Sequence, residues 1–119
     1  MAGTVTTTEV TYGTVQRIYY DWASTTGGVA SGASTNLYCG AVLGASWTNS
    51  TSANPTDAYD ITITDAYGMD VLAGQGLNST NGARTFVASG CMPVCNSALT
   101  LNVANAGESK AGCLAVFVR

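Results

Sequence analysis

The strongest constraint on this chain is the alternation of apolar and polar side chains in the segment YDITITD, residues 59–65. Tyr59, Ile61 and Ile63 share one parity, so in an extended strand they lie on one face with polar residues opposite. Elsewhere, glycines and β-branched residues interrupt every window in which a helical period could persist. The sequence therefore predicts an all-β fold without substantial helix.

Further apolar runs, separated by stretches rich in Gly, Asn and Ser, predict seven or eight strands in one antiparallel β-sandwich, a jelly roll being one option. The length of 119 residues suits a single domain with a modest core. We expect a flexible N-terminal arm over residues 1–8 and a sandwich domain over 9–119. The expected strands cover about residues 9–22, 37–48, 59–64, 69–73, 84–88, 98–103 and 113–118.

Two of these segments carry finer expectations. In the strand over 9–22, Thr14 and Gln16 interrupt the apolar face, which indicates a bulge or a change of environment in the middle of the strand. In the strand over 37–48, glycines at positions 40 and 44 would allow a bend or the close approach of another backbone. The residues of that strand expected on the core face are Leu37, Cys39, Ala41, Leu43, Ala45 and Trp47. Residues 24–36 and 90–96 are expected to be loops.

Charge is sparse and slightly acidic, with 9 % charged residues and a net charge of −3. The four basic residues are dispersed, which argues against nucleic-acid binding because such a surface needs clustered cations. The chain has no apolar run long enough to span a membrane, and its first residues lack a secretory signal pattern. We therefore expect a cytosol-like compartment. So few charges also favour a surface that is partly covered by other protein subunits.

Four of the seven acidic residues, Asp57, Asp60, Asp65 and Asp70, lie within fourteen positions. The segment DAYG, residues 65–68, has the Asp and Gly positions of a type I turn. We expect Asp65 to cap this turn, and Asp60 and Asp70 to face solvent at strand edges. The spacing does not fit a calcium loop. A surface cation site and a catalytic carboxylate pair are the less favoured alternatives.

The chain contains no histidine, which removes the commonest general base and most metal-site templates. We expect no enzymatic activity, no catalytic residue and no cofactor. Cys39 and Cys113 are expected to be buried small apolar residues. Cys91 and Cys95 could form a local disulfide, bind zinc with outside partners, or stay as thiols, and a zinc site of all four cysteines is a weaker option.

Aromatic residues and the last strand bear on binding. Trp22, Trp47 and the tyrosines could line a carbohydrate platform, although such residues more often fill a core or an oligomer interface. In CLAVFVR, residues 113–119, both parities are apolar. Such a strand is covered on both sides, either within its own domain or by a neighbouring subunit.

Three blocks of the chain, VTYGTVQRIYYDW, PTDAYDITITDAYGMDVLAG and LTLNVANAGESKAGCLAVFVR, resemble a family of small virion proteins of tailed bacteriophages. In size, β character and low charge the chain is similar to head decoration, or cement, proteins. The resemblance implies a structural protein on the exterior of the virion head, assembled in the host cytoplasm, that binds and stabilises the mature shell. The loop with Cys91 and Cys95 departs from the family pattern, so no role is carried over to it.

The resemblance further implies two partners, the major capsid protein and other copies of the chain, with a trimer expected. Nucleic acid and membrane are not expected partners. Alternatives are a head–tail connector or tail component, and a carbohydrate-binding β-sandwich module. The residues expected to contact the capsid or a neighbouring subunit come from the arm and from the loop over 24–36: Ala2, Gly3, Thr4, Val5, Gly27, Gly28 and Val29.

Overall fold

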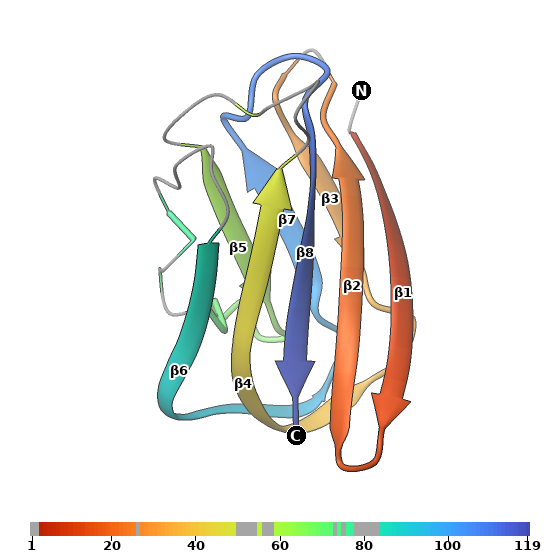
Figure 1. Ribbon diagram of the computed structural model, residues 1–119, viewed down its shortest axis with the longest axis vertical. Coiled ribbons are helices and arrows are strands. Elements are labelled where there is room, and N and C mark those ends of the chain that lie inside the picture. Colours follow the sequence, from red (N-terminus) through yellow and green to blue (C-terminus); the bar gives the residue numbers. More distant parts are fainter. Residues whose placement is uncertain are drawn as a thin grey trace.

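The computed structural model describes residues 3–25, 27–49, 55, 59–72, 74, 76–77 and 84–119; for residues 49, 84–93 and 95 it describes the backbone only. The described residues form eight strands and no helix, so the prediction of an all-β fold is confirmed (Figure 1). None of them forms a helix with the length and apolar character needed to cross a bilayer. The strands are β1 (Thr4–Tyr12), β2 (Val15–Ala23), β3 (Ala30–Ala33), β4 (Tyr38–Asn49), β5 (Asp60–Thr64), β6 (Arg84–Ser97), β7 (Thr100–Ala104) and β8 (Ala111–Val118).

The strands make two antiparallel sheets that face each other, as expected for a β-sandwich (Figure 1). The five-stranded sheet has the order β1-β2-β8-β4-β6, and the three-stranded sheet has the order β3-β7-β5. The larger sheet curls, so that its edge strand β1 packs against β3 of the smaller sheet. At this junction Val5 lies against Gly32, where an added Cβ atom would come within 2.6 Å of the Val5 side chain.

The expected arm and the expected strand over 9–22 are instead a β-hairpin, so both predictions were wrong in their boundaries. Residues from Thr4 onward belong to β1, and Tyr12 pairs with Val15 across a two-residue turn. Gly13 opens this turn with a φ of 61°, a conformation that glycine adopts without strain. Because paired residue numbers add to an odd sum, residues of equal parity in β1 and β2 face opposite sides of the sheet.

In β4 the face that points to the core changes partway along the strand. A register shift between Val42 and Gly44 occurs in the pairing with both neighbours, β6 and β8. Val42 is buried before the shift and Ala45 and Trp47 after it. Of the residues of the expected core parity before the shift, Leu37 (62 % exposed) and Cys39 are exposed and Ala41 is half-buried. The prediction was therefore correct for Ala45 and Trp47 and wrong for Leu37, Cys39 and Leu43. A bulge adds one residue to a strand and so reverses its parity.

Three loop and strand boundaries also differ from the sequence-based expectation. The expected loop over 24–36 contains β3, and the expected loop over 90–96 is part of β6. Of the expected returning strand over 69–73, the described residues 69–72 contain a single bridge between Thr64 and Asp70, followed by a turn, and residue 73 lies outside the described residues. These segments are rich in polar and small residues, which predict loops, whereas their strand pairing depends on neighbours distant in sequence.

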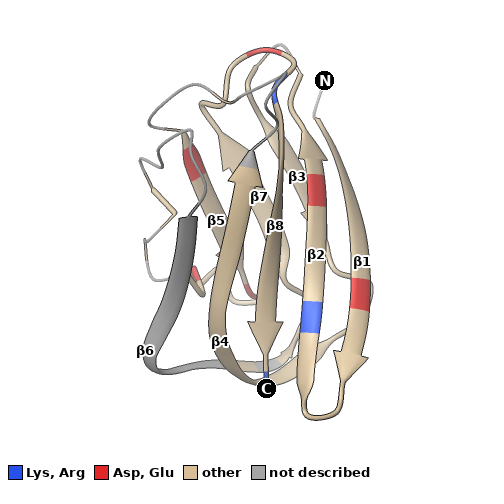
Figure 2. Ribbon diagram, viewed as in Figure 1, with Lys and Arg blue, Asp and Glu red and all other residues tan. Residues whose placement is uncertain are grey.

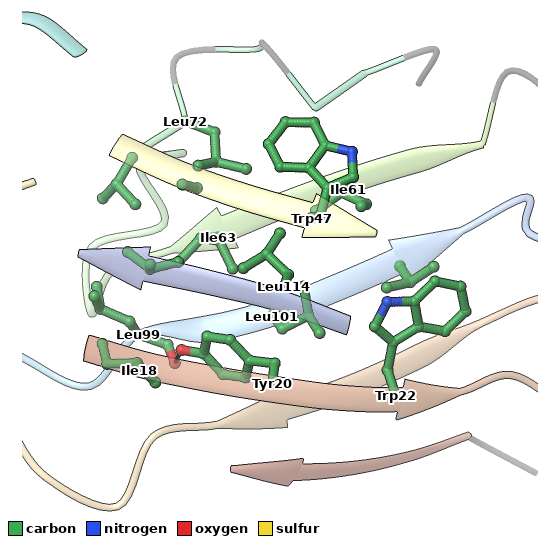
Figure 3. Close-up of a cluster of buried hydrophobic side chains, with 14 of the residues drawn as sticks. Ile18, Tyr20, Trp22, Trp47, Ile61, Ile63, Leu72, Leu99, Leu101 and Leu114 are labelled. Atoms are coloured by element: carbon green, nitrogen blue, oxygen red, sulfur yellow. Dashed lines mark hydrogen bonds between the residues drawn. The ribbon is translucent and has the colours of Figure 1, made fainter. Parts of the chain in front are cut away.

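The core lies between the two sheets and is lined mainly by alternate residues of β2, β5, β7 and β8 and by part of β4. β8 alternates half-buried and buried residues along its whole length, and β5 buries Ile61 and Ile63 as predicted. Figure 3 shows Trp22, Trp47 and Tyr20 in this cluster, and the Tyr20 hydroxyl donates a hydrogen bond of 2.6 Å to the Leu99 carbonyl. Burial of this phenol raises its pKa. The aromatic residues thus pack as core rather than as a surface platform.

Candidate interaction surfaces

One end of the molecule brings together most of the residues predicted to contact a capsid or a neighbouring subunit. This N-terminal end consists of Gly3–Val5, the loop residues 24–25 and 27–29, and the loop 105–110. The Gly3 N–H donates to the Val29 carbonyl at 3.1 Å, and the Ala106 N–H donates to the Gly28 carbonyl at 3.1 Å. Segments far apart in sequence therefore form one surface. Ala2 lies outside the described residues.

Close backbone packing holds this N-terminal end together. A Cβ atom at Gly3 would meet the carbonyl oxygens of Ala23 and Val29, and one at Gly28 would come within 2.8 Å of the Gly107 nitrogen. Gly28 also has a φ of 69°, which favours glycine. Both glycines are therefore required by packing, and side-chain contact with a partner is left to exposed neighbours such as Val29, which is 42 % exposed.

Ser24 connects the two loops of this end by hydrogen bonds. The Ser24 hydroxyl donates to the Gly107 carbonyl at 2.7 Å and accepts from the Lys110 N–H at 2.9 Å. The Ser24 N–H donates in addition to the Lys110 carbonyl at 2.7 Å. These bonds connect the end of β2 to the start of β8, so the N-terminal end is a preorganised surface rather than a free arm. Of the predicted residues, Thr4, Gly27 and Val29 are exposed, and Val5 is half-buried against β3.

A second surface is the outer face of the five-stranded sheet. Its centre is formed by the outward residues of β8, Cys113, Ala115 and Phe117, which are all half-buried. Figure 2 shows that β4 and β8 carry no charged residue along their length, and their sequences contain none. β8 was predicted to be covered on both sides, and its inner side is indeed buried in the core. On its outer side, the described part of the chain provides no second layer.

On β1 and β2 this outer face is partly charged. Arg17 pairs with Phe117 of β8 and with Val10 of β1, and its guanidinium lies 5.4 Å from the centroid of the Tyr12 ring. Tyr12 is 56 % exposed. The arginine is thus stacked on an aromatic ring at the margin of the uncharged surface formed by β4 and β8.

The Cys113 thiol on this face has polar neighbours. Its sulfur lies 3.1 Å from the Thr48 hydroxyl oxygen, and a hydrogen bond with Cys113, followed by burial, raises the pKa of Tyr19 to about 12. Cys113 is half-buried and Cys39 is exposed, so the prediction that both are buried core residues was wrong. Cys113 pairs with Thr48, nine positions along β4 from Cys39, or roughly 30 Å at about 3.3 Å per residue. A zinc site of all four cysteines is therefore excluded.

The clustered acidic residues accept hydrogen bonds that hold turns and loops in place. The Asp65 carboxylate accepts from the N–H groups of Tyr67 and Met69 at 2.9 and 3.0 Å, and the Gly68 N–H donates to the Asp65 carbonyl, which confirms the predicted turn. Asp60 accepts from the Asn105 side chain at 2.8 Å. Among the described residues, no group of three potential ligands could hold a metal ion. Asp57 lies outside the described residues.

Two further carboxylates, which sequence reasoning did not assign to these tasks, organise loops. Asp70, expected at a solvent-facing edge, accepts from the N–H groups of Ile63, Leu72 and Gly74 at 3.2, 3.0 and 2.9 Å. Glu9 accepts from the Thr35 and Asn36 N–H groups and from the Tyr38 hydroxyl, at 2.9, 3.0 and 2.6 Å. No local sequence motif predicts the Glu9 contacts, because the residues that donate these hydrogen bonds lie 26 to 29 positions away in the sequence.

The charge of Glu9 is stabilised by these hydrogen bonds. Burial by itself raises the pKa of the Glu9 carboxyl, but the hydrogen bonds from Tyr38, Asn36 and Thr35 outweigh it and leave the pKa below its ordinary value. For Tyr38, burial and the hydrogen bond to Glu9 both raise the pKa of the phenol. The carboxylate and the phenol therefore form a fixed structural contact at neutral pH.

A carbohydrate platform of Trp22 and Trp47 is not available, because both side chains are core residues with exposures of 2 % and 1 %. Tyr67 and Tyr12 remain exposed, on the turn after β5 and at the end of β1. Comparisons of the chain with known proteins found no matching protein-family model, no matching curated protein and no matching solved structure.

Proposed function

We propose that this protein is a non-enzymatic structural component of a tailed-phage virion, which decorates the exterior of the head and stabilises the mature shell. The sequence resemblance to small virion proteins motivates the proposal. The single structural observation that supports it best is the uncharged outer face of β4 and β8, centred on Ala115 and Phe117 of β8. Half-buried apolar faces of this kind are typical of surfaces that meet another subunit.

In this proposal the protein acts by mass action. A protein that binds the mature shell and not its precursor stabilises the mature state by its binding free energy. Capsids present the same site many times around local symmetry axes, so a small symmetric oligomer, here a trimer, fits each one. The partners are the major capsid protein and other copies of this chain.

The two candidate surfaces suit the two partners. The outer face is broad, sheet-like and poor in charge, as expected of contacts between copies of one chain. The N-terminal end is narrower and held by backbone hydrogen bonds, and it contains most of the residues predicted to contact a capsid. We assign self-association to the outer face and capsid contact to the exposed residues Thr4, Gly27 and Val29.

The roles of the carboxylates support a non-enzymatic function. Glu9, Asp65 and Asp70 each accept two or three hydrogen bonds in which backbone N–H groups predominate. A carboxylate occupied in this way is a structural cap and is poorly placed to exchange protons with a substrate.

The first test is the copy number of this chain in purified virus particles, measured by quantitative mass spectrometry against the major capsid protein. A head decoration protein gives a copy number comparable with that of the capsid protein. A few copies per particle would instead assign the chain to the head–tail connector or the tail. Absence from the particle would reject a virion role.

A second test addresses the capsid contact. Val29→Asp places a charge on the N-terminal end, and Leu37→Asp places the same charge on an exposed aliphatic position, 62 % exposed, in the loop before β4 at the other end. Binding to mature shells that lack the protein, followed by co-sedimentation, is expected to be lost for Val29→Asp and retained for Leu37→Asp. Equal binding by both variants would remove the N-terminal end as the contact.

The oligomer is tested by sedimentation velocity of the purified protein. We expect a trimer for the wild type and a smaller species for Ala115→Arg, which places a charge at the centre of the outer face. Thr62→Arg, a comparable change on β5 of the other sheet, is the matched control and is expected to leave the trimer intact. A wild-type monomer at all concentrations would contradict the assignment of this face to self-association.

A further inference from the structure

The pairing of β4 with β6 places two cysteine positions opposite each other. Gly40 pairs with Val94, Ala41 with Pro93 and Val42 with Met92. Continued by one step, the same register sets position 39 against position 95, and both are cysteines. The next pair, Tyr38 with Ser97, is displaced by one residue.

The displaced residue is Asn96, which has a φ of 48°. A residue in the left-handed region next to a register shift of one is the signature of a β-bulge. The bulge therefore takes up the extra residue between Cys95 and Ser97. The register shift falls between Tyr38 and Gly40, and with Asn96 as the extra residue position 39 faces position 95.

The type of pair follows from the hydrogen bonds of the neighbouring strand. Ala41 exchanges two backbone hydrogen bonds with Arg119, at 3.0 and 2.9 Å, so its N–H and C=O point toward β8 and away from β6. The pair of Ala41 with Pro93 is therefore not hydrogen bonded, which also explains how a proline without an N–H fits within β6. Pairs alternate along an antiparallel ladder, so positions 39 and 95 form the next non-hydrogen-bonded pair.

This kind of pair suits a disulfide. In a non-hydrogen-bonded antiparallel pair the Cα atoms are about 4.5 Å apart. Disulfide-linked cysteines have Cα atoms roughly 4.4–6.8 Å apart. Positions 91 and 95, in contrast, are four residues apart on the same strand β6, or roughly 13 Å in an extended chain. A local disulfide between these two cysteines would require β6 to be broken.

We propose that Cys39 and Cys95 form a cross-strand disulfide when the folded protein meets an oxidant such as oxidised glutathione. The thiolate of one cysteine attacks glutathione disulfide and releases one glutathione. The second cysteine thiolate then attacks the mixed disulfide and releases another, so two protein thiols are oxidised as one glutathione disulfide is reduced to two glutathiones. Cys39 is exposed, which allows the oxidant access.

The disulfide has a structural consequence that does not depend on the proposed function. β6 is an edge strand of the five-stranded sheet and pairs only with β4 among the described strands. A covalent bond between these strands fastens that edge at the end where β6 turns toward β7. Thiols stay reduced in a cytosol and are oxidised outside it, so the bond would form after the protein leaves the cell in which it is made.

Peptide mapping tests the pairing directly. The reduced protein is oxidised with glutathione disulfide at low protein concentration, its remaining thiols are alkylated under denaturing conditions, and it is digested with trypsin. Cleavage after Arg17, Arg84 and Lys110 separates the cysteines into peptides 18–84, 85–110 and 111–119. We expect peptide 18–84 linked to peptide 85–110, with release of both by reductant. An internal bond within 85–110, a link to 111–119, a bond between two chains, or no bond would overturn the proposal.

Serine variants separate the two cysteines of peptide 85–110. The link is expected to persist in Cys91→Ser and to be lost in Cys95→Ser and in Cys39→Ser. The opposite result for the Cys91 and Cys95 variants would overturn the assignment. A second readout is the thermal midpoint, which we expect to be higher for the oxidised than for the reduced protein in the wild type and in Cys91→Ser. In Cys39→Ser the two midpoints are expected to coincide.

Discussion

The two sheets end in edge strands that are secured in different ways. In the three-stranded sheet, β5 is covered by its own downstream segment: the Ile61 N–H donates to the Gly76 carbonyl, and the Val71 N–H donates to the Ile63 carbonyl. The Ile63 N–H donates to the Asp70 carboxylate. Asp70, Val71 and Gly76 thus take the place of a neighbouring strand, and the β5 edge is closed to pairing with another chain at these points.

The β1 edge of the five-stranded sheet is secured at fewer points. The two-residue turn makes Tyr12 and Val15 a hydrogen-bonded pair, so alternate residues from Thr11 back to Gly3 point their backbone groups outward. Among these residues of the described chain, Gly3 is the one whose N–H has a backbone partner, at Val29. The rest of the edge relies on the contact between Val5 and Gly32 and on Glu9, which binds a loop of another element. We infer that the stability of the β5 edge, which is closed by hydrogen bonds, depends more on single residues than the stability of the β1 edge, which is closed mainly by packing.

Glycine-to-alanine substitutions at the two edges are expected to show the largest difference in stability loss. A Cβ atom at Gly76 would meet the carbonyl oxygen of Ile61, so Gly76→Ala forces the covering segment away from β5. We expect a loss of about 2–3 kcal/mol in the free energy of unfolding, measured by urea denaturation. Gly3→Ala meets backbone just as closely, but Gly3 precedes the first residue of β1, where few contacts depend on it, so a loss of about 1 kcal/mol is expected. Equal losses would contradict the comparison.

Removal of the Asp70 carboxylate is the next largest effect. Asp70→Ala leaves the N–H of the buried residue Ile63 without its acceptor, and we expect a loss of about 2 kcal/mol. Asp70→Asn keeps one oxygen for Ile63 and Leu72 and loses the acceptor of the Gly74 N–H, so about half of that loss is expected. Hydrogen exchange at the Ile63 amide is the specific measurement. If exchange there is as slow in Asp70→Ala as in the wild type, the carboxylate does not close the edge.

Glu9 gives the β1 region a pH dependence. Its carboxyl pKa is lowered in the folded protein, so its contribution is complete above the unfolded pKa and is lost as the pH falls through the folded pKa. Glu9→Gln is expected to cost about 1 kcal/mol at neutral pH and to flatten the decline in stability as the pH falls below about 5 through the folded pKa of Glu9. Denaturation curves over this range provide the test. Parallel declines in wild type and variant would show that the carboxylate is not responsible.

The smallest effect is expected on the outward side of β1. Thr6 is exposed and pairs with Asp21 of β2, so Thr6→Lys adds a charge next to an opposite charge and disturbs no packing. The free energy of unfolding is expected to change by less than about 0.5 kcal/mol. A larger loss would mean that this part of β1 is covered in the folded protein, for example by another copy of the chain.

Local alternation was sufficient to predict the fold class and several of its elements. The parity of Ile61 and Ile63, the turn at Asp65 and the buried side of β8 follow from residues that are neighbours in sequence. Each of these features depends on local chemistry, which a sequence displays directly.

The remaining features depend on contacts between distant residues. Gly13 reads equally well as part of an interrupted strand or as the turn of a hairpin, and only pairing with β8 selects the hairpin. The parity change in β4 follows from the bulge near Gly44, and the roles of Glu9 and Asp70 from partners brought close by folding. Such features carry no local pattern, because the energy that favours them arises between strands.

The positions of Gly3 and Arg119 have a practical consequence for any fusion protein. The two residues lie at opposite ends of a molecule whose longest dimension is 36 Å (Figure 1). A reporter or affinity tag joined after Arg119 would project from the end opposite the N-terminal loops and would leave Val29 accessible. The same tag joined before Gly3 would crowd those loops. Comparing the partner binding of two fusion proteins, one tagged at each terminus, would therefore show which end of the protein faces its partner.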